Sequence, residues 1–263
     1  MAELYDRIGK DYDTTRRADP EIVRRLAHHL QRIRGDRVLD VACGTGNYTM
    51  ALSQLGMRLT GVDVSEEMVT KAREKSTDVH WVTGDVNSLA FDNSSFQGAT
   101  CVLAIHHFDD LIASFREVHR VLADGGRFVI FTSSPEQMQR YWLNAYFPRA
   151  MKLSIDQMPS VEVALECLRH AEFSIVGTES FLVEPDLKDF FLYSGKFQPH
   201  MYLNPAVRSG ISTFANLASA EEIETGCRKL QNDIDTSRIH LVMNEYASTL
   251  GDYMFIVAET PKR

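Results

Sequence analysis

The chain has 263 residues, of which 44% are hydrophobic and 24% are charged. This ordinary globular mixture excludes a disordered or fibrous protein, and the length suits one large domain. Lysine and arginine number 28 and aspartate and glutamate number 36, which gives a net charge of −8 and disfavours broad nucleic-acid binding, because phosphate backbones repel an acidic chain.

No segment has the pattern of a membrane anchor or of a metal site. The longest apolar stretch, residues 99–105, is far shorter than the ~20 residues that a membrane-spanning helix needs. The first residues are charged and contain no apolar run, unlike a secretory signal. Four cysteines are spread along the chain without a CxxC pair. We therefore expect a cytoplasmic protein without a bound metal or a membrane partner.

Strands and helices alternate through the first half of the chain. Asp19 and Pro20 predict the start of a helix, which Gly35 ends. Apolar runs predict strands at 37–41, 58–64, 80–83, 99–105 and 127–132, and helical patterns lie between most of them. This alternation is typical of an α/β fold with a doubly wound, mostly parallel sheet, in which ligands bind at the carboxyl ends of the strands.

The rhythm changes after residue 133. Ser160 predicts a helix over 161–170, and strands are expected at 173–183 and 252–258. Residues 135–159 and 186–250 are rich in aromatic side chains, and long segments of this kind are usually functional. We predict a single domain over 1–263, in which these two segments are insertions that form a substrate cap.

Glycines and acidic residues mark the ends of the first three strands. Asp40 precedes a turn that contains Gly44 and Gly46, where a backbone without side chains can approach a ligand closely. Asp63 ends the second strand, where a carboxylate can accept both hydroxyls of a ribose. Asp85 follows the third strand and can accept from an exocyclic amine such as that of adenine. The three acids together favour a cationic nucleoside.

Several segments carry a resemblance to a known family. They are DVACGTG (40–46), GVDVSEEMV (61–69), GDV (84–86), LAIHHFDD (103–110) and REVHRVLADGGRFVI (116–130). The sequence resembles the small-molecule, type 11-like group of S-adenosylmethionine-dependent methyltransferases with a Rossmann-like fold. It departs from the pattern at Ala42, where many members have glycine. With the strand pattern, this predicts a seven-stranded sheet whose last strand is antiparallel.

The resemblance implies S-adenosylmethionine as the cofactor and S-adenosylhomocysteine as its product. The expected cofactor contacts are Tyr12, Arg17, Asp40, Ala42, Gly44, Gly46, Asp63, Val64, Met68, Asp85, Val86 and Ala104. Two of these positions have an alternative interpretation. Tyr12 can instead belong to a surface helix docked on the domain, and Arg17 to a solvated pair of arginines.

Catalytic and substrate residues are expected near the same edge of the sheet. His106 or His107 can take a proton from the substrate, or the pair can shape the loop through hydrogen bonds. The residues expected to contact the substrate are Tyr146, Tyr193, Lys196, Tyr202 and Arg208. The alternatives are a packing layer or a dimer face for this segment, and an ion pair with a nearby acid for the two cations.

The sequence thus predicts an enzyme that transfers the methyl group of S-adenosylmethionine to an N, O or C atom of a small molecule. A non-catalytic cofactor-binding module is a second hypothesis. An NAD-dependent oxidoreductase is a third, although Thr49 stands where its glycine motif requires a third glycine. We expect a monomer or a homodimer whose partner is a small-molecule substrate.

Overall fold

The computed structural model describes residues 15–31 and 34–262. Within them, seven strands form one sheet in the order β3-β2-β1-β4-β5-β7-β6. The strands are β1 (Arg37–Val41), β2 (Arg58–Asp63), β3 (His80–Thr83), β4 (Phe96–Val102), β5 (Leu122–Thr132), β6 (Ser174–Phe181) and β7 (Tyr253–Glu259). Only β7 runs against its neighbours, because it pairs antiparallel with both β5 and β6. The predicted doubly wound, mostly parallel sheet with an antiparallel last strand is confirmed.

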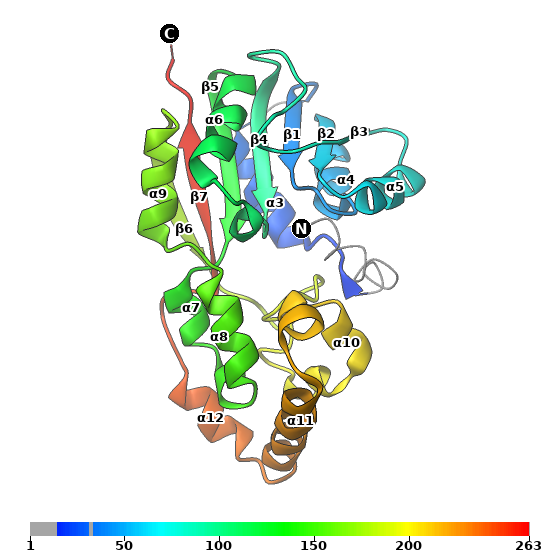
Figure 1. The fold of residues 1–263 in the computed structure, drawn as a ribbon, viewed down its shortest axis with the longest axis vertical. Coiled ribbons are helices and arrows are strands. Elements are labelled where there is room, and N and C mark those ends of the chain that lie inside the picture. Colours follow the sequence, from blue (N-terminus) through cyan, green and yellow to red (C-terminus); the bar gives the residue numbers. More distant parts are fainter. Residues whose placement is uncertain (1–14, 32–33, 263) are drawn as a thin grey trace.

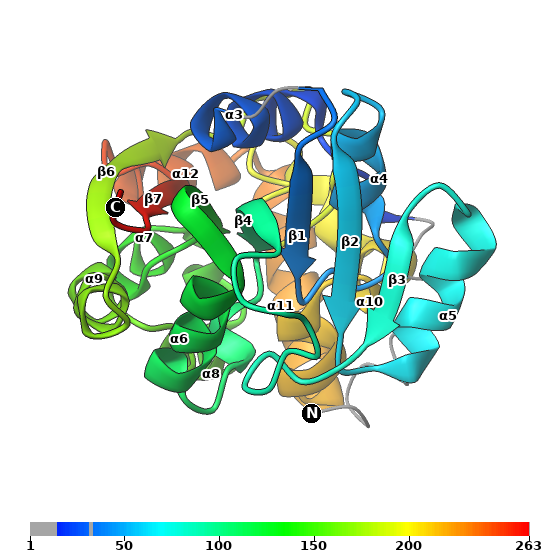
Figure 2. The same cartoon turned by 90° about the horizontal axis from the view of Figure 1, so that it is seen from above.

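Helices cover both faces of the sheet. On one face lie α3 (Pro20–Leu30), α4 (Asn47–Ser53) and α5 (Glu66–Lys75). On the other face lie α6 (Leu111–Val121) and α9 (Val161–His170). Figure 2 shows α3 on one side of the strands and α6 and α9 on the other. The strands between them are buried on both sides, which explains their nearly continuous apolar sequences.

The remaining helices form a second tier below the sheet in the view of Figure 1. They are α7 (Pro135–Gln139), α8 (Pro148–Asp156), α10 (Pro205–Ser209), α11 (Ala220–Asp235) and α12 (Ile239–Glu245). All five come from the two segments that the sequence singled out, 135–159 and 186–250. None of the helices in the described ranges combines the length and the apolar character that a membrane crossing requires.

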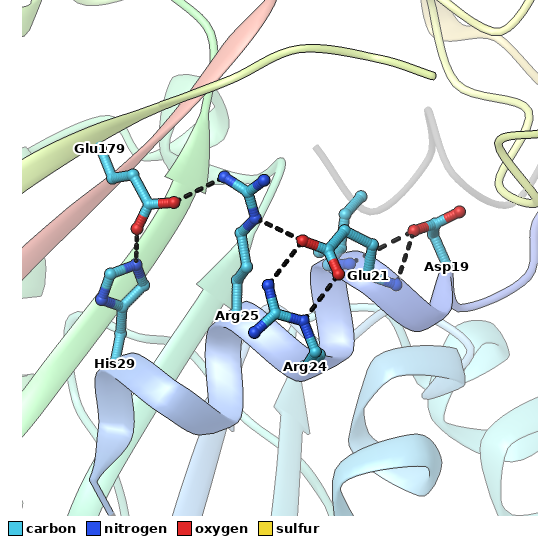
Figure 3. A network of polar contacts seen from close by, with 7 residues as sticks. Asp19, Glu21, Arg24, Arg25, His29 and Glu179 are labelled. Atoms are coloured by element: carbon cyan, nitrogen blue, oxygen red, sulfur yellow. Dashed lines mark hydrogen bonds and ion pairs between the residues drawn. The ribbon is translucent and has the colours of Figure 1, made fainter. Parts of the chain in front are cut away.

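Ion pairs connect α3 to the edge strand β6 (Figure 3). Arg25 lies 2.8 Å from Glu21 on its own helix and 2.5 Å from Glu179 on β6. Nε2 of His29, one turn further along α3, lies 2.7 Å from the second carboxylate oxygen of Glu179. At the other end of the helix, Asp19 accepts hydrogen bonds from the backbone N–H groups of the first turn, as the sequence predicted.

Strand β4 ends three residues earlier than its apolar sequence predicts. It stops at Val102, because Leu103 adopts a left-handed backbone conformation with φ of 54°. A single 3₁₀ turn, Ile105–His107, follows. The two histidines therefore lie in a turn beyond the strand, at the edge where the carboxyl ends of the parallel strands meet.

Candidate active site

A cavity of 410 Å³ lies at the carboxyl ends of the parallel strands. Residues at or just after the ends of these strands form one wall, among them Gly44, Asp63 and Ala104. Residues of 135–159 and 186–250 form the other wall, among them Met138 and Phe191. The volume is in the range of small-molecule binding sites. The cavity therefore lies between the sheet and the second tier of helices.

The glycine turn after β1 opens toward this cavity. Gly44 has a left-handed φ of 55°, and no atom lies within 4 Å of the place where a Cβ would stand. Gly46 has φ of 77°, but a Cβ there would overlap the ring of Trp81. Gly44 lines the cavity and Gly46 does not. The absence of a side chain at Gly44 leaves space for a ligand, and its absence at Gly46 leaves space for the Trp81 ring.

Asp63 is held in place by the turns on either side of it. Its two carboxylate oxygens accept hydrogen bonds from the N–H groups of Gly44, at 2.8 Å, and of Ser65, at 2.9 Å. Burial raises its pKa above the usual value, against the effect of these bonds. A carboxylate oxygen has further lone pairs, so Asp63 can still accept from hydroxyl groups in the cavity.

Asp40 is more deeply buried, with 2% of its surface exposed. Thr49 and Thr100 donate hydrogen bonds to its two oxygens, at 2.5 and 2.8 Å. Burial raises the pKa of Asp40 to about 6, and the hydroxyl donors only partly oppose this shift. The carboxyl group lines the cavity, and no cationic side chain forms an ion pair with it among the described residues.

The cavity wall is acidic. Five aspartates line it: Asp40, Asp63, Asp85, Asp109 and Asp189. Arg16 is the one lysine or arginine among the described lining residues, and it lies 2.6 Å from the carboxylate of Asp189. Such a wall suits a ligand with a net positive charge and disfavours the pyrophosphate of a dinucleotide. These residues fit S-adenosylmethionine, a cationic nucleoside.

His106 and His107 both line the cavity. Their ring centroids lie 3.9 Å apart. Burial lowers the pKa of His106 to about 3 and that of His107 to about 4, so both imidazoles are neutral at physiological pH. Nδ1 of His106 is buried and has no hydrogen-bond partner among the described residues. A neutral imidazole with an unused nitrogen can accept a proton.

Most of the predicted cofactor residues lie together around the cavity. The lining includes Asp40, Ala42, Gly44, Asp63, Val64, Met68, Asp85, Val86 and Ala104. Arg17 is exposed and lies outside it, whereas the neighbouring Arg16 belongs to it. Tyr12 lies outside the described residues.

None of the five residues predicted to contact the substrate lines this cavity. The tyrosine hydroxyls are bonded within the protein: Tyr146 to Asp233, Tyr193 to the Gln137 carbonyl and Tyr202 to the Leu192 carbonyl. Lys196 lies 2.6 Å from Asp252, and Arg208 donates to the carbonyl of Tyr202. These polar groups stabilise the second tier of helices, because its fold turns them inward. For Lys196, this is the ion pair that the sequence left open.

Sequence reasoning missed the residues that do line the far wall. They include Met138, Met158, Asp189, Phe191, Leu192 and Ile211, and Tyr48 of α4 and Tyr253 of β7 were missed as well. The aromatic composition pointed to the segments that supply most of them. No spacing in the sequence indicates which of their side chains turn toward the cavity.

Comparison with known proteins agrees with this geometry. A family model described as a methyltransferase domain matches residues 39–130. A demethylmenaquinone methyltransferase of Staphylococcus aureus is 32% identical over 186 residues, which are 67% of this chain and 71% of the relative. The residues that the family model matches contain the ends of β1, β2, β3 and β4, which form the sheet-side wall of the cavity.

Solved structures extend the likeness to the second tier. A putative methyltransferase from an antibiotic biosynthesis pathway of Anabaena variabilis has a TM-score of 0.82 and 30% identity, over 92% of this chain and 98% of its own. A putative methyltransferase of Bacillus halodurans shares the fold, with a TM-score of 0.60 and 18% identity over 92% of this chain and 100% of its own. Fold and site define an enzyme that transfers a methyl group to a small-molecule acceptor. The chain belongs to the type 11 group of S-adenosylmethionine-dependent methyltransferases.

Proposed function

We propose that the enzyme methylates a largely apolar acceptor that carries a hydroxyl group, such as a phenol or a hydroquinone, and that His106 accepts the hydroxyl proton. Two observations carry this proposal: His106 lines the cavity, and its buried Nδ1 has no hydrogen-bond partner among the described residues. The insertions 135–159 and 186–250 act as the substrate cap, because their residues form the wall opposite the strand ends.

The sheet-side wall holds the methyl donor. Asp63 accepts from the ribose hydroxyls, Gly44 leaves room for the methionine part, and Asp85 accepts from the adenine amine. Met68 is buried beside them and packs on the base. S-adenosylmethionine supplies an electrophilic methyl group on a sulfonium centre. The protein's own task is to place an acceptor atom in line with that methyl group and to exclude water.

The cap-side wall determines the chemistry of the acceptor. Its larger side chains are apolar, and its polar side chains are the small hydroxyl residues and Asp189, which is paired with Arg16. The apolar ones are Met138, Met158, Phe191, Leu192 and Ile211. Two hydroxyls of this wall, on Ser154 and Thr213, are hydrogen-bonded to each other at 2.9 Å. This wall favours an aromatic or otherwise apolar body, because the described cap residues present no unpaired charge to it.

His106 completes the reaction at the junction of the two walls. As the acceptor attacks the methyl group, positive charge develops on the acceptor and its hydroxyl becomes strongly acidic. A neutral imidazole can then take the proton, even though its pKa in the empty cavity is low. His107 packs against His106. A charge on either ring disfavours a charge on the other, so a single proton is taken up and then released to solvent.

The name of the Staphylococcus relative supports an acceptor of this class. Demethylmenaquinone is a quinone, and the reduced form of a quinone carries two hydroxyl groups on an apolar ring. We propose an acceptor with the same kind of head group for this chain.

Mass spectrometry with deuteriomethyl-labelled S-adenosylmethionine tests the proposal. The acceptors are 1,4-naphthohydroquinone, kept reduced under oxygen-free conditions, and 1-naphthylamine, which has a similar body but no hydroxyl. We expect label in the hydroquinone alone. His106→Ala should lower kcat about 100-fold or more and leave S-adenosylhomocysteine affinity by calorimetry unchanged. Transfer to the amine alone, or full activity of His106→Ala, would contradict the proposal.

A further inference from the structure

One buried tyrosine differs from the others in how its hydroxyl is used. The hydroxyl of Tyr48 donates to Asp189, that of Tyr146 donates to Asp233, and that of Tyr193 donates to a backbone carbonyl. Tyr253 is equally buried, with 3% of its surface exposed, but its hydroxyl makes no hydrogen bond to any residue in the described ranges. Buried tyrosine hydroxyls normally have a partner, so this one calls for an explanation.

The position of Tyr253 supplies the explanation. It is the first residue of β7, beside the end of β5, and it lines the cavity together with His106. Its ring centroid lies 5.3 Å from that of Phe131, 4.8 Å from Phe191 and 5.1 Å from Tyr193. These contacts fix the position of the ring. The hydroxyl group of Tyr253 is left available for a ligand in the cavity.

The backbone of Tyr253 is held as firmly as its ring. The side chain of Gln137 donates a 3.0 Å hydrogen bond to its carbonyl, and the strand pairs Tyr253 with Phe181 of β6. Burial raises the pKa of the Tyr253 phenol well above its usual value, so the hydroxyl keeps its proton. The side chain is a preorganised hydrogen-bond donor in a mostly apolar wall.

We propose that Tyr253 is a specificity-determining residue, whose hydroxyl donates a hydrogen bond to an oxygen atom of the methyl acceptor. This inference rests on the proposed function and narrows it. His106 accepts a hydrogen bond, whereas Tyr253 donates one. The site therefore selects acceptors with two oxygen functions: a hydroxyl that faces His106 and a second oxygen that faces Tyr253.

Two probes separate this contact from general binding. 1,4-Naphthohydroquinone has both oxygens, and 1-naphthol has the same ring system with one. Affinities for the two probes are measured by calorimetry in the presence of S-adenosylhomocysteine, without oxygen and without turnover. The wild-type protein should bind the hydroquinone more tightly. Tyr253→Phe should weaken hydroquinone binding about tenfold and leave 1-naphthol binding nearly unchanged.

Tyr193→Phe is the matched control. The two tyrosine rings are neighbours, but the Tyr193 hydroxyl is bonded to the Gln137 carbonyl at 3.0 Å and lies outside the cavity lining. This control should lower Tm and leave the ratio of the two probe affinities unchanged. Tyr253→Phe removes no hydrogen bond of the fold, so its Tm should stay the same or rise.

Each result bears on one claim. An unchanged affinity ratio in Tyr253→Phe, with methyl transfer to the hydroquinone intact, would overturn the Tyr253 assignment alone. A loss of Tm in Tyr253→Phe as large as in Tyr193→Phe would make its role structural and would also overturn the assignment. Wild-type protein that binds neither probe would overturn the acceptor class on which both proposals depend.

Discussion

The hydroxyl of Tyr48 donates a 3.0 Å hydrogen bond to the carboxylate of Asp189, although the two residues are 141 positions apart. Tyr48 belongs to α4, which packs on the sheet, and Asp189 lies in the segment 186–250. Arg16 lies 2.6 Å from the other oxygen of the same carboxylate. All three side chains line the cavity. A charged, mostly buried contact therefore connects α4 to the segment 186–250 at the edge of the cavity.

Tyr48→Phe tests how much the hydrogen bond to Asp189 contributes to the stability of the fold. The variant loses a hydrogen bond to a charged acceptor and should lower the free energy of unfolding by about 1.5–3 kcal/mol. Tyr246→Phe is the control, because its hydroxyl makes no hydrogen bond to the residues that the structure describes. Urea titrations of both variants measure the difference. Equal stability of Tyr48→Phe and the wild type would show that this hydrogen bond contributes nothing to the free energy of unfolding.

The two glycines of the turn after β1 should respond differently to alanine. Gly44→Ala meets no protein atom but must adopt a left-handed backbone, so we expect a loss of about 1 kcal/mol in stability and weaker S-adenosylhomocysteine binding. Gly46→Ala forces its methyl group against Trp81 and should cost about 1–3 kcal/mol through overpacking. Thermal melts and calorimetry separate the two effects. A Gly44→Ala protein with wild-type affinity would remove this turn from the donor site.

Asp63 should matter for donor binding beyond its charge. Asp63→Asn loses an acceptor for the ribose hydroxyls and should weaken S-adenosylmethionine binding by ~1.5–3 kcal/mol. Asp109→Asn removes the same charge from the wall of the same cavity, but Asp109 is exposed and lies in the loop after the histidine turn. Calorimetry on both variants is decisive. An equal loss of affinity in both variants would mean that donor binding depends only on the overall charge of the cavity.

The raised pKa of Asp40 predicts a stability difference that depends on pH. The folded protein holds this proton up to about pH 6, whereas an unfolded chain releases it near the ordinary value of 3.8. Between these values the folded state binds more protons, so the contribution of Asp40 to stability falls as pH rises through this window. Asp40→Asn should then be more stable than the wild type at pH 7, by up to about 3 kcal/mol.

Melts from pH 4 to pH 8 check this prediction. The advantage of Asp40→Asn should shrink as pH falls and should be mostly lost by pH 4, because the unfolded wild-type chain also begins to bind this proton near its ordinary pKa of 3.8. A difference in stability that stays constant across this range would show that Asp40 titrates normally.

The sequence was sufficient for the topology of the sheet and for most of the residues that line the cavity at the strand ends. Strand ends, capping residues and the glycine turn are local signals, and Asp40, Asp63 and Asp85 each lie at or near the end of an expected strand. The end of β4 escaped prediction because the apolar run continues through Leu103, where only the backbone angle changes.

The opposite wall of the cavity could not be predicted in the same way. Met158, Phe191 and Ile211 meet only because the second tier of helices packs them against one cavity. Tyr193 and Tyr202 have the composition of a binding site, yet their hydroxyls bond to backbone carbonyls within the protein. Composition indicated segments that contribute to the cavity wall, but it does not reveal which of their side chains face the cavity.

The position of β7 also has a consequence for how the protein is made. This strand lies between β5 and β6, and β6 pairs with no other strand of the described chain. During translation, β6 is therefore synthesised about 70 residues before β7, the strand with which it pairs. Until β7 is made, the segment between the two strands cannot pack against a complete sheet. Translation must pass residue 259 before the outer strands join, so nascent chains shorter than this should remain sensitive to proteases over 174–250 while the region before β5 is already protected.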